Sequence, residues 1–191
     1  MHPFFCPLST MSIPGVACLL IDLQEPFLNS IPDNQSIRTR CSFVIQACGL
    51  LGIPVYFTTQ VKGKLGPTAP ELKDLVPEAP EWDKNTFSAW PVESLQARLK
   101  DDGIQHLLVG GIETPICVYQ TVIGAHADGF ETTLLSDCIG CRRSQDGDSV
   151  LRALSQHGIL ALPSESVFYS MLGGVSHPAF RDFTRLVKNH S

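Results

Sequence analysis

The chain has 191 residues, of which 43% are hydrophobic and 17% are charged, and its formal net charge is −5. This composition supplies enough apolar material for one sizeable core and differs from that of disordered chains. The net negative charge, without a basic stripe, argues against a nucleic-acid partner, and the apolar runs are too short to form a membrane span.

The N-terminal segment and the cysteines give information on the cellular compartment of the protein. Residues 1–14 lack the charged and apolar regions of a secretory signal, so we interpret them as a flexible leader, with Met11 as an alternative start. Residues 15–191 are expected to form a single domain. The seven cysteines are odd in number, and the chain is large for a disulfide scaffold, which favours reduced thiols and a cytoplasmic location.

Apolar runs alternate along the chain with segments of helical periodicity. The continuous apolar run at 16–22 is typical of a strand that is buried on both faces. The Pro- and Gly-rich segment 60–81 indicates a long loop. This alternation predicts a three-layer α/β/α fold with a mainly parallel sheet of five to six strands. Further strands are predicted at 54–59, 106–110, 131–135 and 159–162, and helices at 35–51, 91–102, 114–128, 149–157 and 177–188.

Cys117 stands at the beginning of a predicted helix. With Thr114 as N-cap and Pro115 as the first helical residue, the thiol lies in the first turn, where unpaired N–H groups favour a thiolate. The same N–H groups could hold an oxyanion. The alternative is that Cys117 is a small buried core residue.

Two charged residues could assist this cysteine. Asp22 closes the first strand, at the edge where open parallel sheets place their sites, although it could also be an N-cap. Lys84 lies in a predicted loop, where a lysine is usually a solvated charge. Together, a carboxylate, an ammonium and a thiol would provide a base, a stabilising charge and a nucleophile.

An ordered set of motifs resembles a known family. The segments are 22-DLQ-24, 59-TQ-60 with 64-KLGPT-68, 84-KNTFS-88 and 111-GIETPICV-118. From about residue 16 to residue 188 the chain resembles the isochorismatase-like cysteine hydrolases, which have a Rossmann-like fold, and in particular the isochorismatase domain-containing and YcaC-like branch. This resemblance implies a catalytic triad of Asp22, Lys84 and Cys117 and a homo-oligomer. It also implies a cis peptide between Ile112 and Glu113, with an oxyanion hole built from the amides of Glu113 and Cys117.

The implied reaction is hydrolysis of a small amide, or a related acyl compound, through a thioester on the cysteine. One alternative is a binding or scaffold protein that keeps the same pocket but turns over little substrate. A thiol-redox protein that uses Cys117 with Cys138 or Cys141 is another. Nicotinamidase-type amidases of the family carry an Asp/His metal site after the second strand, where this chain has 59-TQVK-62. We therefore expect no metal and no cofactor, and nicotinamidase activity is less favoured.

The expected ligand is a small molecule, and five further residues are candidates to line its pocket. For the aromatic members of this set, core packing is an equally good interpretation. The Cys138-x-x-Cys141 spacing is expected to be structural, because no second Cys or His pair follows at a distance typical of zinc sites. The candidate pocket residues are Gln24, Phe27, Gln60, Phe87 and Trp90.

Overall fold

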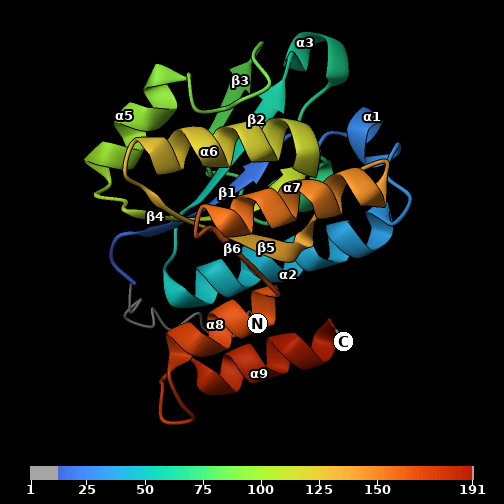
Figure 1. Ribbon diagram of the computed structural model, residues 1–191. Helices are drawn as coiled ribbons and strands as arrows, with labels where there is room; N and C mark the ends of the chain where they lie inside the picture. Colours follow the sequence, from blue (N-terminus) through green and yellow to red (C-terminus); the bar gives the residue numbers. More distant parts are fainter. Residues whose placement is uncertain (1–12, 191) are drawn as a thin grey trace.

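The computed structural model describes residues 13–190 and contains a central sheet with helices on both faces (Figure 1). The strands lie in the order β3-β2-β1-β4-β5-β6, and all neighbouring pairs are parallel. This confirms the predicted α/β class and the parallel sheet. The strands are β1 (Val16–Ile21), β2 (Val55–Gln60), β3 (Glu81–Lys84), β4 (His106–Ile112), β5 (Glu131–Gly140) and β6 (Leu160–Leu162).

Helices connect most of the strands. Within residues 13–190, no helix is long and apolar enough to cross a membrane. Most of the predicted leader, residues 1–12, lies outside the described residues. The helices are α1 (Glu25–Leu28), α2 (Asn34–Leu51), α3 (Lys62–Leu65), α4 (Pro70–Lys73), α5 (Glu93–Asp101), the π-helix η1 (Thr114–Val118), α6 (Tyr119–Ala127), α7 (Ser144–Gln156), α8 (Ser164–Leu172) and α9 (Phe180–Asn189).

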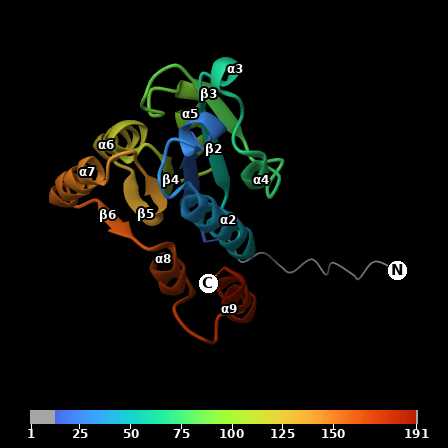
Figure 2. The same cartoon turned by 90° about the vertical axis from the view of Figure 1, so that its right-hand side faces the viewer.

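The alternation of side chains along β1 divides the core into two halves. Ala17, Leu19 and Ile21 belong to the cluster that packs against α5, α6 and α7. Cys18 and Leu20 belong to the cluster formed with α2, α8 and α9. Figure 2 shows α6 and α7 on the opposite side of the sheet from α2. Since both faces of β1 are covered, the strand is apolar throughout, as parallel central strands are.

The strand order creates a switch point between β1 and β4. From β1 the chain moves outward to β2 and β3, and it then returns to the other side of β1 to form β4, β5 and β6. At such a point the connections leave the carboxyl ends of the two central strands in opposite directions, which opens a crevice there. Asp22 follows β1 and the segment 113–118 follows β4, so both border this crevice.

Several predicted boundaries were wrong. The segment 60–81 is not only a loop, because it contains the short helices α3 and α4 and the start of β3. Strand β3 has four residues of mixed polarity, so its sequence alone does not indicate a strand. It is a strand because it pairs with β2. Strand β5 continues five residues beyond the predicted end, to Gly140. Helix α7 begins at Ser144 instead of 149, and α9 begins at Phe180 instead of 177.

Helix α8 was missed altogether. It lies between Pro163 and Gly173, and Gly173 ends it in the left-handed conformation. Val167, Phe168 and Leu172 are buried at helical spacing. A proline before a helix and a glycine after it are known boundary signals, so this helix could have been found from the sequence.

Gly111 allows β4 to approach β1 beside Asp22. Its φ is +122°, and a Cβ atom at this position would lie 2.2 Å from the carbonyl oxygen of Ile21. Backbone atoms cannot move aside as a flexible side chain can. A residue larger than glycine would therefore push apart the two strands that border the crevice.

We expect Gly111→Ala to lower the free energy of unfolding by roughly 3 kcal/mol, because it combines a backbone clash with an unfavourable φ. The measurement is urea denaturation followed by circular dichroism. Gly63→Ala is the matched control, because a Cβ atom there meets nothing within 4 Å and φ is not positive. Equal stability of the two variants would contradict the close approach of β4 to β1.

Candidate active site

A buried ion pair joins the ends of β1 and β3. Lys84 Nζ donates to Asp22 Oδ2 at 2.6 Å, and the two side chains are 1% and 0% exposed. The other carboxylate oxygen of Asp22 accepts a hydrogen bond of 2.9 Å from the hydroxyl of Thr58. Lys84 is therefore the last residue of a strand and not a solvated loop lysine, which corrects the expectation from its local sequence.

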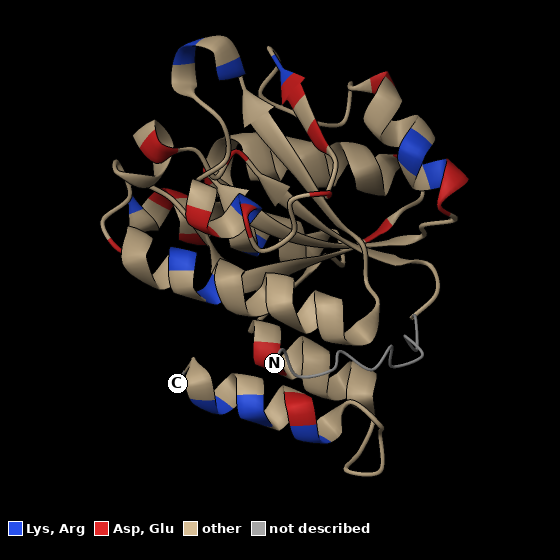
Figure 3. Ribbon diagram, turned by 180° about the vertical axis from the view of Figure 1, so that it is seen from behind, with Lys and Arg blue, Asp and Glu red and all other residues tan. Residues whose placement is uncertain are grey.

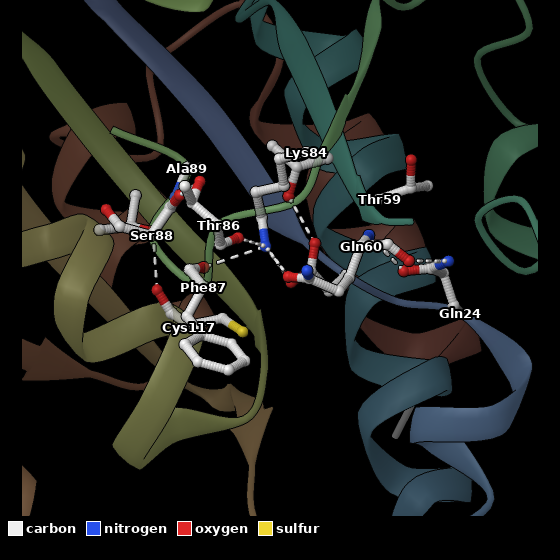
Figure 4. A network of polar contacts seen from close by, with 12 residues as sticks. Gln24, Thr59, Gln60, Lys84, Thr86, Phe87, Ser88, Ala89 and Cys117 are labelled. Carbon is white, nitrogen blue, oxygen red and sulfur yellow. Dashed lines mark hydrogen bonds and ion pairs between the residues drawn. The ribbon is translucent and has the colours of Figure 1, made fainter. Parts of the chain in front are cut away.

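Oxygen atoms surround the Lys84 ammonium. In addition to Asp22, it donates to Gln60 Oε1 at 2.8 Å and to the carbonyls of Thr86 and Phe87 at 3.1 and 3.0 Å (Figure 4). Gln24 in turn accepts from the Gln60 N–H at 2.6 Å and donates to the Gln60 carbonyl at 3.2 Å. Gln24 thus lies behind the site, where it positions Gln60.

Cys117 lies in a π-helical turn, which forms the first part of the helix predicted from Thr114. The N–H of Val118 donates to the carbonyl of Glu113, five residues earlier. The Thr114 hydroxyl does not cap the turn, because it donates to the carbonyl of Gly140 at 3.1 Å. It joins this turn to β5 instead. Single π-turns of this kind occur frequently at functional sites.

The turn that holds Cys117 is also linked to the loop after β3. Thr121 donates its hydroxyl to the Cys117 carbonyl at 2.6 Å and accepts from the Ala89 N–H at 2.8 Å. Lys84 holds the beginning of this loop through the carbonyls of Thr86 and Phe87. The loop is therefore fixed at both ends, one toward Asp22 and the other toward Cys117.

The electrostatics of the site favour a thiol at rest. Burial raises the pKa of Cys117 to about 12, with a further contribution from the negative charge of Asp22. Burial also raises the pKa of Asp22, although Lys84 opposes this change. The expected thiolate at rest was wrong, because burial and the Asp22 charge outweigh the Lys84 charge and the backbone N–H of Glu113.

Glu113 faces Cys117 with its backbone and Arg142 with its side chain. Its peptide bond with Ile112 is cis, and its backbone N–H acts to lower the pKa of Cys117. The carboxylate accepts from Arg142 Nε at 2.9 Å and from the Arg142 backbone N–H at 3.2 Å. An N–H directed at the nucleophile is suitably placed to stabilise negative charge that develops there.

A cavity of about 200 Å³ opens beside the sulfur. Three of the predicted pocket residues line it, and Gln24 lies behind Gln60. Sequence reasoning did not select Ile116 and Arg142, which carry no motif signal and reach the cavity only through the fold. The lining residues are Phe27, Gln60, Phe87, Ile112, Glu113, Ile116, Cys117 and Arg142.

Trp90 was wrongly placed in the pocket. Its ring packs edge-on against Phe130 with centroids 5.0 Å apart, and its indole N–H donates to Asp128 at 2.6 Å. It is 6% exposed and belongs to the core half formed with α5, α6 and α7. The core-packing interpretation was the correct one for this aromatic residue.

Comparison with known proteins assigns the chain to a family. A model of the isochorismatase domain matches residues 16–166. The chain belongs to the isochorismatase family. Isochorismatase domain-containing protein 2 of Danio rerio is 31% identical over 184 residues, which cover 95% of this chain and 91% of that protein.

Two solved structures with a fold similar to that of this isochorismatase-family hydrolase illustrate the likeness. The MAR1 ribonuclease of Caenorhabditis elegans has a TM-score of 0.86 at 29% identity, covering 93% of this chain and 92% of its own. YcaC of Escherichia coli has a TM-score of 0.76 at 21% identity, covering 97% and 98%. YcaC is described as an octameric hydrolase of unknown specificity, and its likeness to the present chain supports the fold.

Two further cysteines of this isochorismatase-family chain lie near the end of β5 and just after it. Cys138 is fully buried and Cys141 is partly buried, and both are free thiols. Among residues 13–190, no group of three or more His, Cys, Asp or Glu side chains could hold a metal ion. Among the described residues, no disulfide joins Cys117 to Cys138 or Cys141.

We expect Asp22→Asn to lower the pKa of Cys117, because the charge of Asp22 is one of the causes that raise it. Removal of a negative neighbour favours the thiolate, so the rate of iodoacetamide alkylation should begin to rise at a lower pH. The measurement is the pH profile of Cys117 modification by mass spectrometry. Asp83→Asn, one residue before Lys84, is the control and should leave the profile unchanged.

Proposed function

We propose that this isochorismatase-family hydrolase cleaves a small amide, or a related acyl compound, through a thioester on Cys117. The observation that carries the proposal is the position of Asp22, whose carboxylate is hydrogen-bonded to the Lys84 ammonium and whose charge raises the pKa of the Cys117 thiol. A base, a nucleophile and a fixed positive charge meet beside a cavity of suitable size.

Acylation begins with a proton transfer from the Cys117 thiol to the Asp22 carboxylate. The sulfur attacks the carbonyl carbon of the substrate, and the N–H groups of Glu113 and Cys117 hold the resulting oxyanion. The C–N bond then breaks, and Asp22 gives its proton to the leaving amine. The raised pKa of Asp22 suits this exchange, because a carboxylate of higher pKa is a stronger base.

Deacylation uses the same carboxylate. Asp22 takes a proton from a water molecule, which attacks the thioester carbon. The C–S bond breaks, and the proton returns from Asp22 to the sulfur. Lys84 keeps its position throughout, because four oxygen atoms hold its ammonium. It stabilises Asp22 without exchanging a proton in either half of the reaction.

A small-molecule substrate suits this chain better than RNA. The Caenorhabditis elegans relative is named a ribonuclease, but the present chain has a net charge of −5. Figure 3 shows Lys and Arg residues interspersed with Asp and Glu residues. Nucleic-acid sites depend on clustered positive charge to neutralise phosphates, and the cavity beside Cys117 is largely apolar.

We expect the wild type to release ammonia from small primary amides, and Cys117→Ala and Asp22→Asn to lower kcat/KM by ~100-fold or more, because each removes a group that takes part in bond cleavage. The measurement is a coupled ammonia assay, with an RNA cleavage assay on the same preparations. Cys141→Ser is the control, because it removes a thiol that the proposed mechanism does not use.

A binding protein without turnover is the second candidate, and the raised pKa of Cys117 favours it. If no amide is hydrolysed while small amides still protect Cys117 from alkylation, the binding role replaces the hydrolase. RNA cleavage that depends on Cys117 would overturn the choice of a small substrate.

We also propose that the chain is a cytoplasmic homo-oligomer. Its reduced thiols support the location, and the octameric YcaC neighbour supports self-association. The edge strand β6 exposes 56% of Leu160 and 37% of Leu162, and such apolar edges invite pairing with another chain.

We expect analytical ultracentrifugation of the wild type to show an oligomer and that of Leu160→Asp to show a smaller species. Leu75→Asp, at another exposed leucine, is the control. A wild-type monomer would contradict the oligomer, and an unchanged mass of Leu160→Asp would exclude this edge as the interface.

A further inference from the structure

The cavity beside Cys117 presents apolar side chains to a ligand. Phe27, Ile112 and Ile116 line it, and Phe87 completes the aromatic part of the wall. Phe87 is 58% exposed although it is large and apolar, and Figure 4 places its ring beside the Cys117 sulfur. An exposed aromatic ring next to a nucleophile is suitably placed to contact the acyl group of a bound substrate.

The position of Phe87 depends on the catalytic charges. Its carbonyl accepts a hydrogen bond of 3.0 Å from Lys84 Nζ, the same ammonium that holds Asp22. Lys84 therefore positions both Phe87, in the apolar wall, and the Asp22 carboxylate. The backbone of Phe87 is therefore held in place by the site, although its ring is exposed.

The charges around the cavity cancel in pairs. Asp22 and Lys84 lie 2.6 Å apart, and Glu113 and Arg142 lie 2.9 Å apart. Among the described residues that line the cavity, Glu113 and Arg142 are the only charged ones. A substrate carboxylate needs a cation that is not already neutralised, and an unpaired charge is costly to bury. The one cation among the described lining residues, Arg142, already has the Glu113 carboxylate as its partner.

We propose that this site selects uncharged primary amides of small apolar carboxylic acids and rejects anionic ones. The inference rests on the proposed amide hydrolysis and adds the substrate class to it. The apolar wall provides the affinity for the acyl group, and the pairing of Arg142 with Glu113 weakens the attraction for an anion.

The direct test compares iodoacetamide with iodoacetate as alkylating reagents. With either one the thiolate attacks the CH₂ carbon, the C–S bond forms, the C–I bond breaks and iodide leaves. One reagent carries a neutral primary amide and the other a carboxylate. Both react with the same thiolate, so the ratio of their rate constants does not depend on the pKa of Cys117.

We expect the iodoacetamide-to-iodoacetate ratio at Cys117 to exceed that of N-acetylcysteine by roughly tenfold or more. Glu113→Gln should lower the ratio, because it leaves Arg142 as an unpaired cation. Arg142→Gln should raise it, because it leaves Glu113 as an unpaired anion. A wild-type ratio equal to that of N-acetylcysteine, or variants that both shift it in one direction, would overturn the inference.

A second measurement separates this inference from the proposed function. Butyramide and succinamate have chains of similar length, but the second carries a carboxylate, and we expect kcat/KM to be roughly tenfold or more higher for butyramide. If succinamate is preferred and its hydrolysis requires Cys117, the proposed function stands and the inference fails. If neither is hydrolysed, the proposed function fails, and the alkylation ratio still decides the inference.

Discussion

The structure around Cys117 depends on the ion pair between Asp22 and Lys84. Both charges are withdrawn from water, and such a pair is favourable only when hydrogen bonds satisfy the remaining donors and acceptors. Here the Thr58 hydroxyl donates a hydrogen bond to the other oxygen of Asp22, while Gln60 and two backbone carbonyls accept hydrogen bonds from Lys84. The pair thereby joins the ends of three neighbouring strands and fixes the loop that carries Phe87.

The same pair explains how a buried thiol can react. Burial holds the proton on Cys117, which slows oxidation and alkylation of the sulfur at rest. The proposed proton acceptor, Asp22, is close enough to the thiol for each to shift the pKa of the other, and burial makes that carboxylate a better base. In the proposed mechanism, the substrate carbonyl binds between the sulfur and the amide of Glu113. The thiol can then react, because the negative charge that develops during attack is transferred from the sulfur to the carbonyl oxygen.

The sequence was informative where local pattern and fold coincide. The apolar run of β1 predicted a strand covered on both faces, and two of the three residues that the ordered motifs indicated, Asp22 and Lys84, form an ion pair. It was misleading where tertiary contacts decide the outcome. Lys84 was taken for a loop residue because β3 is a strand only through its pairing with β2. The thiol at rest could not be predicted, because the burial of Cys117 depends on the packing of several elements. Arg142 is part of the site through its ion pair with Glu113. No sequence motif indicates this pair.

The most direct test of the central claim is rapid-quench mass spectrometry of the Cys117 peptide during hydrolysis of p-nitrophenyl butyrate, an activated ester. Our account predicts one butyryl group on Cys117 in the wild type. It predicts longer persistence of that group in Asp22→Asn, because the variant lacks the carboxylate that activates water for deacylation. Turnover of the ester with Cys117 unmodified, or equally rapid loss of the group in both proteins, would contradict it.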